Sequence, residues 1–314
     1  MKPEKNIKYS IIILLEESSE GFSQFVQTLY EIFSSKQESF EIIIMANGTE
    51  GFLKNELKHL NGCNDKLKAF ALNKKTPQAV CLKAGINESS GEIIVVCGSY
   101  QQITEASFIQ LINSLDDETD IISPWRQHRV DPFFGRFQSR VFNILVNKIT
   151  KSNLHDLSCS VKIFRRDVLE NIELYGNMYR FLSIVALRKG LKNKEVKCEH
   201  YQEQGKTGFY GLSVYLARII DIFTLYFNTR FTRKPLRFFS TFGAVFLLIG
   251  LFITSYVFVE KIFMGQPIGD RPIFLMAILF MVLGIQAASV GLLGEIIVFT
   301  RGRLKKEYNI EKEI

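Results

Sequence analysis

Cysteine and histidine are scarce in this chain, and their spacing predicts no metal or disulfide site. The 314 residues contain five cysteines and four histidines. No two cysteines form a C-x-x-C pair, and His155 has no partner at a metal-binding spacing. We therefore expect no metal site built on cysteine or histidine, and reduced thiols that pack as small apolar residues. The cysteines are Cys63, Cys81, Cys97, Cys159 and Cys198.

The sequence also shows no pattern of a cleavable signal peptide and no internal repeat. The apolar run at 11–15 is short and is followed directly by Glu16 and Glu17, which does not fit a signal sequence. Residues 238–259 form a long apolar run with no charged side chain. At a rise of ~1.5 Å per residue this run spans ~33 Å, enough to cross a hydrocarbon core of ~30 Å.

A second apolar run, residues 273–299, contains one charge, Glu295, near its end. A buried core helix is the alternative for either run, but core helices rarely stay apolar on every face for this length. Basic residues flank the pair on the outside, whereas the charges in the loop between the runs balance. The positive-inside rule therefore places both outer ends and the N-terminal domain in the cytoplasm. The flanking residues are Arg230, Arg233, Lys234 and Arg237 before, and Arg301, Arg303, Lys305 and Lys306 after.

The net charge of +7 does not indicate nucleic acid. The basic residues concentrate beside the two apolar runs and between Arg126 and Arg140, where lipid headgroups or phosphates account for them better. The predicted partners are therefore membrane lipids, and no nucleic acid.

The first 125 residues alternate between short β-branched runs and helical patterns, which is typical of a parallel sheet buried on both faces. Strands are expected at 9–15, 41–45, 67–72, 93–97 and 120–123, with helices between them. Thr76 and Pro77 predict a helix start, with Thr76 as the cap and Pro77 as the first helical residue. Thr104 is expected to cap a helix to Leu115. Ligands of such sheets bind at the carboxyl ends of strands, here after Leu15, Met45 and Cys97.

The following residues are less regular. A helix is expected from Asp131 to about Thr150, strands near 161–164 and 194–198, and helices near 166–172 and 179–189. Residues 212–227 have an apolar arc that favours an interfacial helix on the bilayer, with a helix packed on the domain as the alternative.

Six segments in the right order carry a resemblance to a known family. They are SPWR at 123–126, DPFFGRFQSRVFN at 131–143, HDLSCSVKIFRR at 155–166, LYGNMYRFL at 174–182, GDRP at 269–272 and GLLGEI at 291–296. The chain resembles family 2 glycosyltransferases of the dolichyl- or polyprenyl-phosphate sugar synthase type. The resemblance implies an α/β fold of the nucleotide-sugar-transferase (GT-A) type, with a mostly parallel sheet, followed by a two-helix transmembrane hairpin. It also implies transfer of a sugar from a nucleotide to polyprenyl phosphate.

With this resemblance the chain divides into four parts. Residues 1–210 form a cytoplasmic glycosyltransferase-like domain, and 211–235 an interfacial amphipathic helix. Residues 236–300 form two transmembrane helices, and 301–314 a cytoplasmic basic tail.

The chain departs from the family at its donor site. The usual Pro-x-Tyr-Asn-Glu after the first strand is replaced by LLEES at 14–18. The family's Asp-Asp-Gly-Ser, whose carboxylate reads the base, falls on Ala46, Asn47, Gly48 and Thr49. Its Asp-x-Asp falls on Gly98, Ser99 and Tyr100, although Gln102 matches the glutamine that follows. Near the membrane, the family's Arg-x-Gly-x-Ser-Lys segment reads EQGKTG at 203–208, which keeps Gly205 and Lys206 but loses the arginine and the second lysine.

These substitutions remove the carboxylates that hold Mg²⁺ or Mn²⁺ in the family, since glycine, a hydroxyl and a neutral phenol are poor ligands for hard cations. We expect the family's metal site to be lost. The sequence favours a catalytically silent protein that keeps lipid-phosphate or partner binding. The alternative is an active, metal-independent transferase in which basic side chains stabilise the diphosphate leaving group.

The candidate residues for that alternative lie in the second half of the domain. Asp156 is the candidate base or acceptor-positioning group, with a local cap or a salt bridge to Arg165 or Arg166 as the structural alternative. By resemblance, the region Arg126–Arg140 holds the lipid phosphate. The candidate phosphate- or lipid-binding residues are Arg126, Arg129, Arg136, Ser139, Arg140 and Lys206, and the alternative for the arginines is a solvated or headgroup-facing surface. A glycan-pathway protein or a second copy of the chain is the candidate protein partner. The small residues Gly284, Ala287 and Gly291 either pack the hairpin or join protomers, and hairpin packing is the expectation.

Overall fold

The structure is a computed structural model. It describes residues 7–16, 20–60, 65–116, 118–127, 144, 146–147, 150, 152, 154–157, 159–170, 172, 178–201, 220, 235–265, 267 and 271–302. The chain separates into two compact units, Met1–Asp221 and Ile222–Ile314. The expected helices at 131–150 and 212–227 and the expected tail at 301–314 lie almost entirely outside the described residues.

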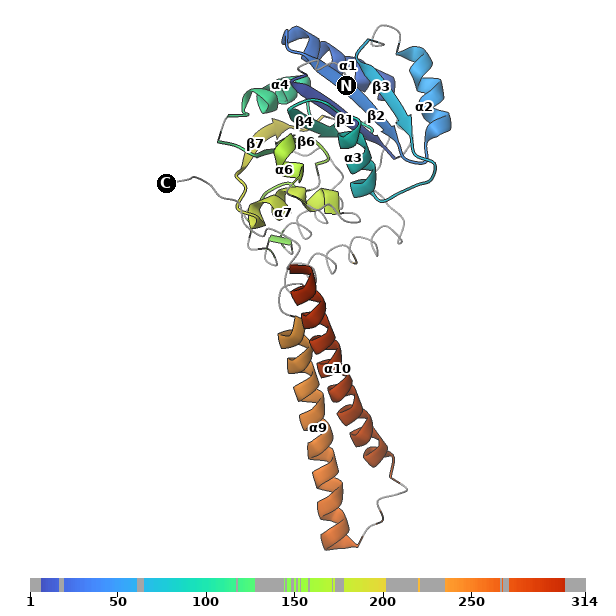
Figure 1. Ribbon diagram of the computed structural model, residues 1–314, viewed down its shortest axis with the longest axis vertical. Coiled ribbons are helices and arrows are strands. Elements are labelled where there is room, and N and C mark those ends of the chain that lie inside the picture. The colour runs from blue at the N-terminus through green and yellow to red at the C-terminus, as the bar shows by residue number, and fades with distance from the viewer. Residues whose placement is uncertain are drawn as a thin grey trace. The chain divides into compact units, whose positions relative to one another are not determined.

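The first unit is built on a sheet with strand order β3-β2-β1-β4-β6-β5-β7 (Figure 1). β6 runs antiparallel to its neighbours β4 and β5, and the other pairs are parallel. This mixed, mostly parallel sheet confirms the expected fold class. The strands are β1 (Tyr9–Leu15), β2 (Phe40–Ala46), β3 (Leu67–Ala71), β4 (Ile93–Cys97), β5 (Ile121–Gln127), β6 (Lys162–Arg165) and β7 (Asn193–Glu199).

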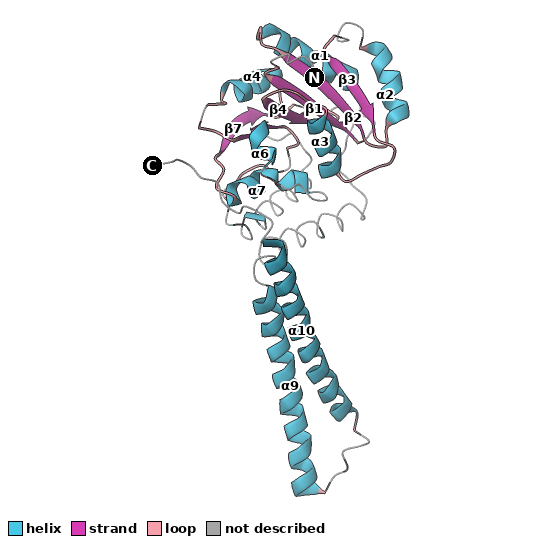
Figure 2. Cartoon of the chain, viewed as in Figure 1, coloured by secondary structure: helices cyan, strands magenta, loops and turns pink. Residues whose placement is uncertain are grey.

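Helices cover both faces of this sheet, as the cyan ribbons on either side of the magenta strands show (Figure 2). One apolar core joins the sheet to α1 (Phe22–Ser35), α2 (Glu50–Glu56) and α4 (Glu105–Asn113). The other joins it to α3 (Gln78–Asn87), α6 (Arg166–Glu170) and α7 (Leu182–Arg188). Every residue of β1, β2 and β4 is buried, which explains why these strands read as continuous apolar runs rather than alternating ones. Two 3₁₀ turns complete the unit, Leu57–His59 and Met178–Phe181.

Thr104 caps α4 as expected, accepting a hydrogen bond from the Ser107 backbone nitrogen at 3.4 Å. The expectation for α3 was wrong by one residue. Pro77, with extended backbone, is the cap, and the helix begins at Gln78. Thr76 does not cap the helix because its backbone nitrogen and hydroxyl both donate to Asn47 Oδ1, at 2.8 and 3.3 Å.

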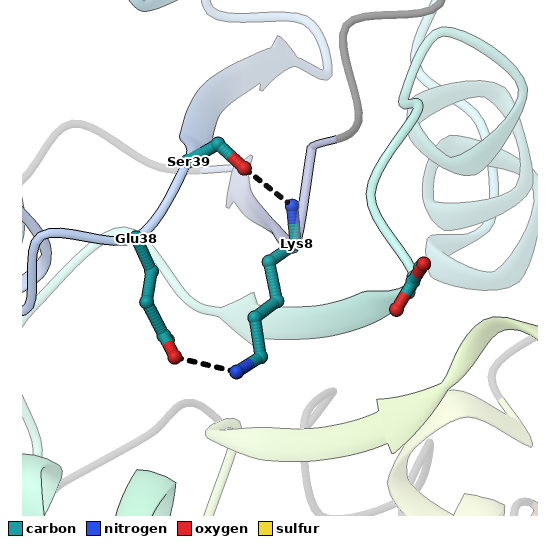
Figure 3. Close-up of a pocket in the computed structure, with 4 residues that line it drawn as sticks. Lys8, Glu38 and Ser39 are labelled. Atoms are coloured by element: carbon teal, nitrogen blue, oxygen red, sulfur yellow. Dashed lines mark hydrogen bonds and ion pairs between the residues drawn. The ribbon is translucent and has the colours of Figure 1, made fainter.

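The amino ends of the strands are closed by ion pairs within the protein. A pocket of about 270 Å³ there is lined by Lys8, Glu38, Ser39 and Glu92, which immediately precede β1, β2 and β4. Lys8 Nζ lies 2.5 Å from Glu38 Oε1, and its backbone nitrogen donates to Ser39 Oγ at 3.0 Å (Figure 3). Deeper in, Glu41 of β2 accepts from Lys68 Nζ, the Ser90 backbone nitrogen and Ser10 Oγ at 2.6, 2.6 and 2.8 Å.

The second unit contains two helices, α9 (Pro235–Met264) and α10 (Pro272–Gly302), each long and apolar enough to cross a membrane. They pack through glycines. A Cβ at Gly243 would lie 2.6 Å from the Gly284 carbonyl oxygen, and a Cβ at Gly284 would lie 2.6 Å from that of Gly243. A Cβ at Gly291 would lie 2.9 Å from the Cβ of Phe239 on α9. The small-residue face therefore packs the hairpin, as expected, and Glu295 Oε2 accepts from the Leu236 backbone nitrogen at 3.3 Å.

The described cysteines, Cys81, Cys97, Cys159 and Cys198, are free thiols and buried, which confirms the expectation for them; Cys63 lies outside the described residues. Burial raises the pKa of Cys81 and of Cys198 to about 12, with the charge of Glu16 adding to the effect at Cys81. Both thiols are therefore unreactive at neutral pH.

Candidate functional site

The three stretches singled out by the sequence meet at the carboxyl edge of the sheet. β1 pairs with β2 on one side and β4 on the other, all in parallel, so Leu15, Ala46 and Cys97 end at the same edge. The helix that follows β1 packs on one face of the sheet, and the helix that precedes β4 packs on the other. The ends of β1 and β4 therefore form a topological switch point, where open α/β sheets bind ligands.

Asn47 is committed to internal hydrogen bonds. It is fully buried, and its side chain forms a two-way pair with Thr76, donating to the Thr76 carbonyl oxygen at 2.7 Å and accepting from the Thr76 nitrogen at 2.8 Å. Ala46, also fully buried, belongs to the apolar core. Neither predicted base-reading position therefore supplies a carboxylate to this edge.

Gly98 lies close to the side chain of Ser160. A Cβ there would be 2.8 Å from Ser160 Oγ, closer than real Cβ contacts. Ser99 is buried, and the described residues hold no group of three or more His, Cys, Asp or Glu side chains that could bind a metal ion. The residues at 98–100 therefore do not fit the divalent cation that the family resemblance implies.

Gln102 ties the loop after β4 to the segment before β6. Its Oε1 accepts from the Ser160 backbone nitrogen at 2.8 Å and from Cys159 Sγ at 3.2 Å. The Tyr179 hydroxyl donates to the Ser160 carbonyl oxygen. The backbone of Ser160 is thus held from two sides, which keeps its Cβ beside Gly98.

Arg126 and Asp156 form a buried ion pair at the end of β5. Arg126 Nε lies 2.7 Å from Asp156 Oδ2, and a terminal guanidinium nitrogen lies 3.2 Å from Oδ1. The two side chains are 4% and 3% exposed. The structure thus joins the predicted base to a predicted phosphate-binding arginine. The structural alternative for Asp156 named the wrong partners, because Arg165 and Arg166 donate to the carbonyl oxygens of Asp116 and Gly91.

The sequence did not single out the residues that surround this pair. His155 stacks on Trp125 with ring centroids 3.9 Å apart, and its Nδ1 lies 2.7 Å from Glu195 Oε2. Lys162 is fully buried in β6, where its Nζ donates to Ser183 Oγ at 3.2 Å. Burial lowers the pKa of Lys162, although the charges of Asp156 and Glu195 oppose the shift.

Glu16 is the residue at the donor edge that the sequence analysis noted only as a departure. Its Oε1 lies 3.3 Å from Asn47 Nδ2, and its Oε2 lies 2.5 Å from Gln78 Nε2. Its position directly after a buried strand was the available signal. Arg129, Arg136, Ser139, Arg140 and Lys206 lie outside the described residues, so the structure places Arg126 alone from the predicted phosphate-binding set.

A mostly parallel α/β sheet with a ligand edge at its switch point, followed by an apolar hairpin, defines the class. The model of the family Glycosyl transferase family 2 matches residues 11–173, more than half of the chain. The chain belongs to this family.

Relatives of known name match over nearly the whole length. A dodecaprenyl-phosphate galacturonate synthase of Rhizobium johnstonii is 24% identical, over 95% of this chain and 90% of its own. An undecaprenyl-phosphate 4-deoxy-4-formamido-L-arabinose transferase of Proteus mirabilis is 23% identical, over 99% and 95%. Glucosyl-3-phosphoglycerate synthase from Mycobacterium tuberculosis, solved with UDP, has a TM-score of 0.52 at 8% identity, covering 71% of this chain and 79% of its own. That likeness shows a shared fold.

Proposed function

We propose that this protein transfers a sugar from a nucleotide sugar to a polyprenyl phosphate, without a divalent cation at the end of β4. The transfer is supported by the family and by relatives named as dodecaprenyl- and undecaprenyl-phosphate sugar transferases. The cation independence rests on one observation, that Gly98, Ser99 and Tyr100 supply no carboxylate at the end of β4.

The reaction makes limited demands on the protein. A phosphate oxygen of polyprenyl phosphate attacks C1 of the sugar, and the bond from C1 to the nucleoside diphosphate oxygen breaks with its electron pair. The products are the polyprenyl phosphate sugar and a nucleoside diphosphate. A phosphate monoester with a second pKa of about 6 is already an anion at neutral pH, so the nucleophile requires no general base. The main demand is positive charge at the leaving diphosphate.

Basic side chains supply that charge in our proposal. Arg126 is held in one orientation by the two oxygens of Asp156, so we assign Asp156 as a positioning residue rather than a base. The remaining members of the set are assigned from the sequence, to the diphosphate or the lipid phosphate. They are Arg129, Arg136, Ser139, Arg140 and Lys206.

Catalytic silence, with retained lipid-phosphate or partner binding, is the second candidate. One observation favours it, namely that Arg126 already shares its guanidinium with a buried carboxylate. Asp156 therefore balances part of the positive charge that Arg126 would offer to a phosphate. Silence would make the chain a binding or scaffolding member of polyprenyl-phosphate glycan metabolism.

The membrane arrangement belongs to the same proposal. The hairpin spans the membrane with its basic flanks and the N-terminal domain on the cytoplasmic side, where residues 211–235 lie at the interface. Because the glycine face is used between α9 and α10, a homo-oligomer would have to use other surfaces. A glycan-pathway protein partner remains part of the proposal on the sequence argument alone.

The test is a transfer assay with purified protein, undecaprenyl phosphate and radiolabelled uridine and guanosine diphosphate sugars, with Mn²⁺ or with EDTA. We expect labelled lipid in both conditions, and none from Arg126→Ala or Lys206→Ala. Lys54→Ala is the matched control, because Lys54 is exposed and paired only within α2. A strict requirement for Mn²⁺ contradicts the proposal. No transfer from any donor, by protein that still binds the lipid, establishes the silent alternative.

A further inference from the structure

Glu16 is a carboxylate that the fold holds at the ligand edge. It follows the last residue of β1 and is partly exposed. Its two partners come from different elements, Asn47 after β2 and Gln78 at the start of α3, at 3.3 and 2.5 Å. Both partners donate through neutral amides, so they orient the carboxylate without cancelling its charge.

Glu16 is not required to tie these elements together. Asn47 already bonds Thr76 in both directions, which fixes the segment before α3 to the end of β2. Gln78 uses its side-chain Nε2 to donate to Glu16, whereas its Oε1 is buried and has no hydrogen-bond partner among the described residues. Asn47 and Gln78 thus position Glu16, and a purely structural role leaves the partly exposed carboxylate unexplained.

The chemistry of a carboxylate fixes what it can recognise. It only accepts hydrogen bonds, and each oxygen has a second lone pair beyond the one used by an amide. Uracil and thymine present one ring N–H, and guanine presents a ring N–H beside an amino group. Cytosine and adenine present a lone pair at the corresponding ring nitrogen and can donate only through the amino group beside it. A carboxylate aligned with the ring nitrogen is therefore repelled by these two bases.

We propose that Glu16 reads the base of the nucleotide donor, and that it selects bases with a ring N–H over cytosine and adenine. The inference rests on the proposed function in one respect, that a nucleotide binds at this edge. It assigns to a residue after β1 the recognition that the sequence analysis considered lost with Ala46 and Asn47.

The experiment is calorimetric titration of the full-length protein in EDTA with the diphosphates of uridine, thymidine, guanosine, cytidine and adenosine. We expect at least one base with a ring N–H to bind tenfold or more tightly than cytidine and adenosine diphosphates. In Glu16→Gln that nucleotide should lose about tenfold in affinity or more, since a hydrogen bond to a charged acceptor is lost. Glu50→Gln, an exposed glutamate paired with Lys54 on α2, should bind like wild type.

The outcomes separate the inference from the proposed function. Wild-type binding without base preference, or unchanged affinity in Glu16→Gln, overturns the role of Glu16 and leaves the transfer proposal standing. No binding of any nucleoside diphosphate overturns both. The base preference is measured on the wild-type protein and does not depend on any variant folding. Glu16→Asp is a second variant, which keeps the negative charge on a side chain shorter by one methylene. We expect this variant to retain the base preference with reduced affinity.

Discussion

The two edges of the same sheet use carboxylates in different ways. At the amino edge, Glu38 and Glu41 each meet a lysine ammonium, Lys8 at 2.5 Å and Lys68 at 2.6 Å. At the carboxyl edge, Glu16 meets only the amides of Asn47 and Gln78. The charge of a carboxylate paired with a lysine is balanced within the protein. A carboxylate that accepts only from neutral amides has no such counter-charge and can accept a hydrogen bond from a ligand. In our proposal the pocket at the amino edge (Figure 3) is part of the scaffold, and the transfer takes place at the opposite edge.

A second contrast divides the carboxyl edge itself. At the ends of β2 and β4, small or neutral residues stand where the family has carboxylates, and each is fixed by internal contacts. At the end of β5, a buried pair of opposite charges is retained. The ends of β2 and β4 thus differ from the end of β5, and we expect mutations at the two places to behave differently.

The largest effect is expected from Arg126→Ala. It leaves Asp156 buried without its ion pair, which should lower the free energy of unfolding by about 3–5 kcal/mol. Denaturant unfolding in detergent, followed by the fluorescence of the single tryptophan, Trp125, measures this. The paired replacement Arg126→Met with Asp156→Leu should recover most of the stability but no turnover. A loss in Arg126→Ala no greater than in Lys54→Ala would show that the pair is not buried as described.

Gly98→Asp should be next. The Ser160 hydroxyl must rotate away from the new side chain and Ser160 Cβ, at 3.3 Å from the added Cβ, must give way, so we expect a loss of about 1–3 kcal/mol. We expect no Mn²⁺ binding, because one carboxylate alone is a poor site for the cation. The addition of Ser160→Gly should restore stability, and Gly98→Asp with Tyr100→Asp should not create metal-dependent turnover. The control is Gly51→Asp, where a Cβ meets nothing within 4 Å. Mn²⁺-stimulated transfer by the Gly98→Asp, Tyr100→Asp protein would contradict the account.

Glu41→Gln should cost about 2 kcal/mol at neutral pH, because it removes a buried charge from its lysine. Burial by itself raises the pKa of Glu41, but the hydrogen bonds from Lys68, Ser90 and Ser10 together hold it below its ordinary value. A depressed pKa stabilises the fold above the unfolded-state pKa of about 4.3, and the contribution disappears as the pH falls through the folded value. The difference between Glu41→Gln and wild type should therefore shrink below about pH 4. A difference that grows in acid would reverse the assigned sign.

The smallest effect is expected from Lys8→Ala. The Lys8–Glu38 pair is partly exposed, and such pairs contribute at most about 1 kcal/mol. Nucleotide affinity should not change, because this pocket lies at the wrong edge of the sheet. A tenfold loss of affinity in Lys8→Ala would reverse the assignment of the two edges.

The sheet and the hairpin were predictable because their signals are local. Continuous β-branched runs gave β1, β2 and β4 to within one residue, and uncharged runs gave α9 and α10. The site was predictable only as a set of strand ends. Its decisive contacts join side chains far apart in the sequence, such as Gln78 with Glu16 and Arg126 with Asp156, separated by 62 and 30 positions. Polar pairs of this kind have no periodicity, so the sequence indicated the residues but not their partners.

The central claim, that the donor edge works without a cation at Gly98, is tested most directly by one binding measurement. The tightest-binding nucleoside diphosphate is titrated into the wild-type protein by calorimetry, once in EDTA and once in Mn²⁺. We predict dissociation constants that agree within about twofold, because no carboxylate at 98–100 is available to couple the metal to the phosphates. Binding that appears only with Mn²⁺, or tightens tenfold or more with it, would contradict the account.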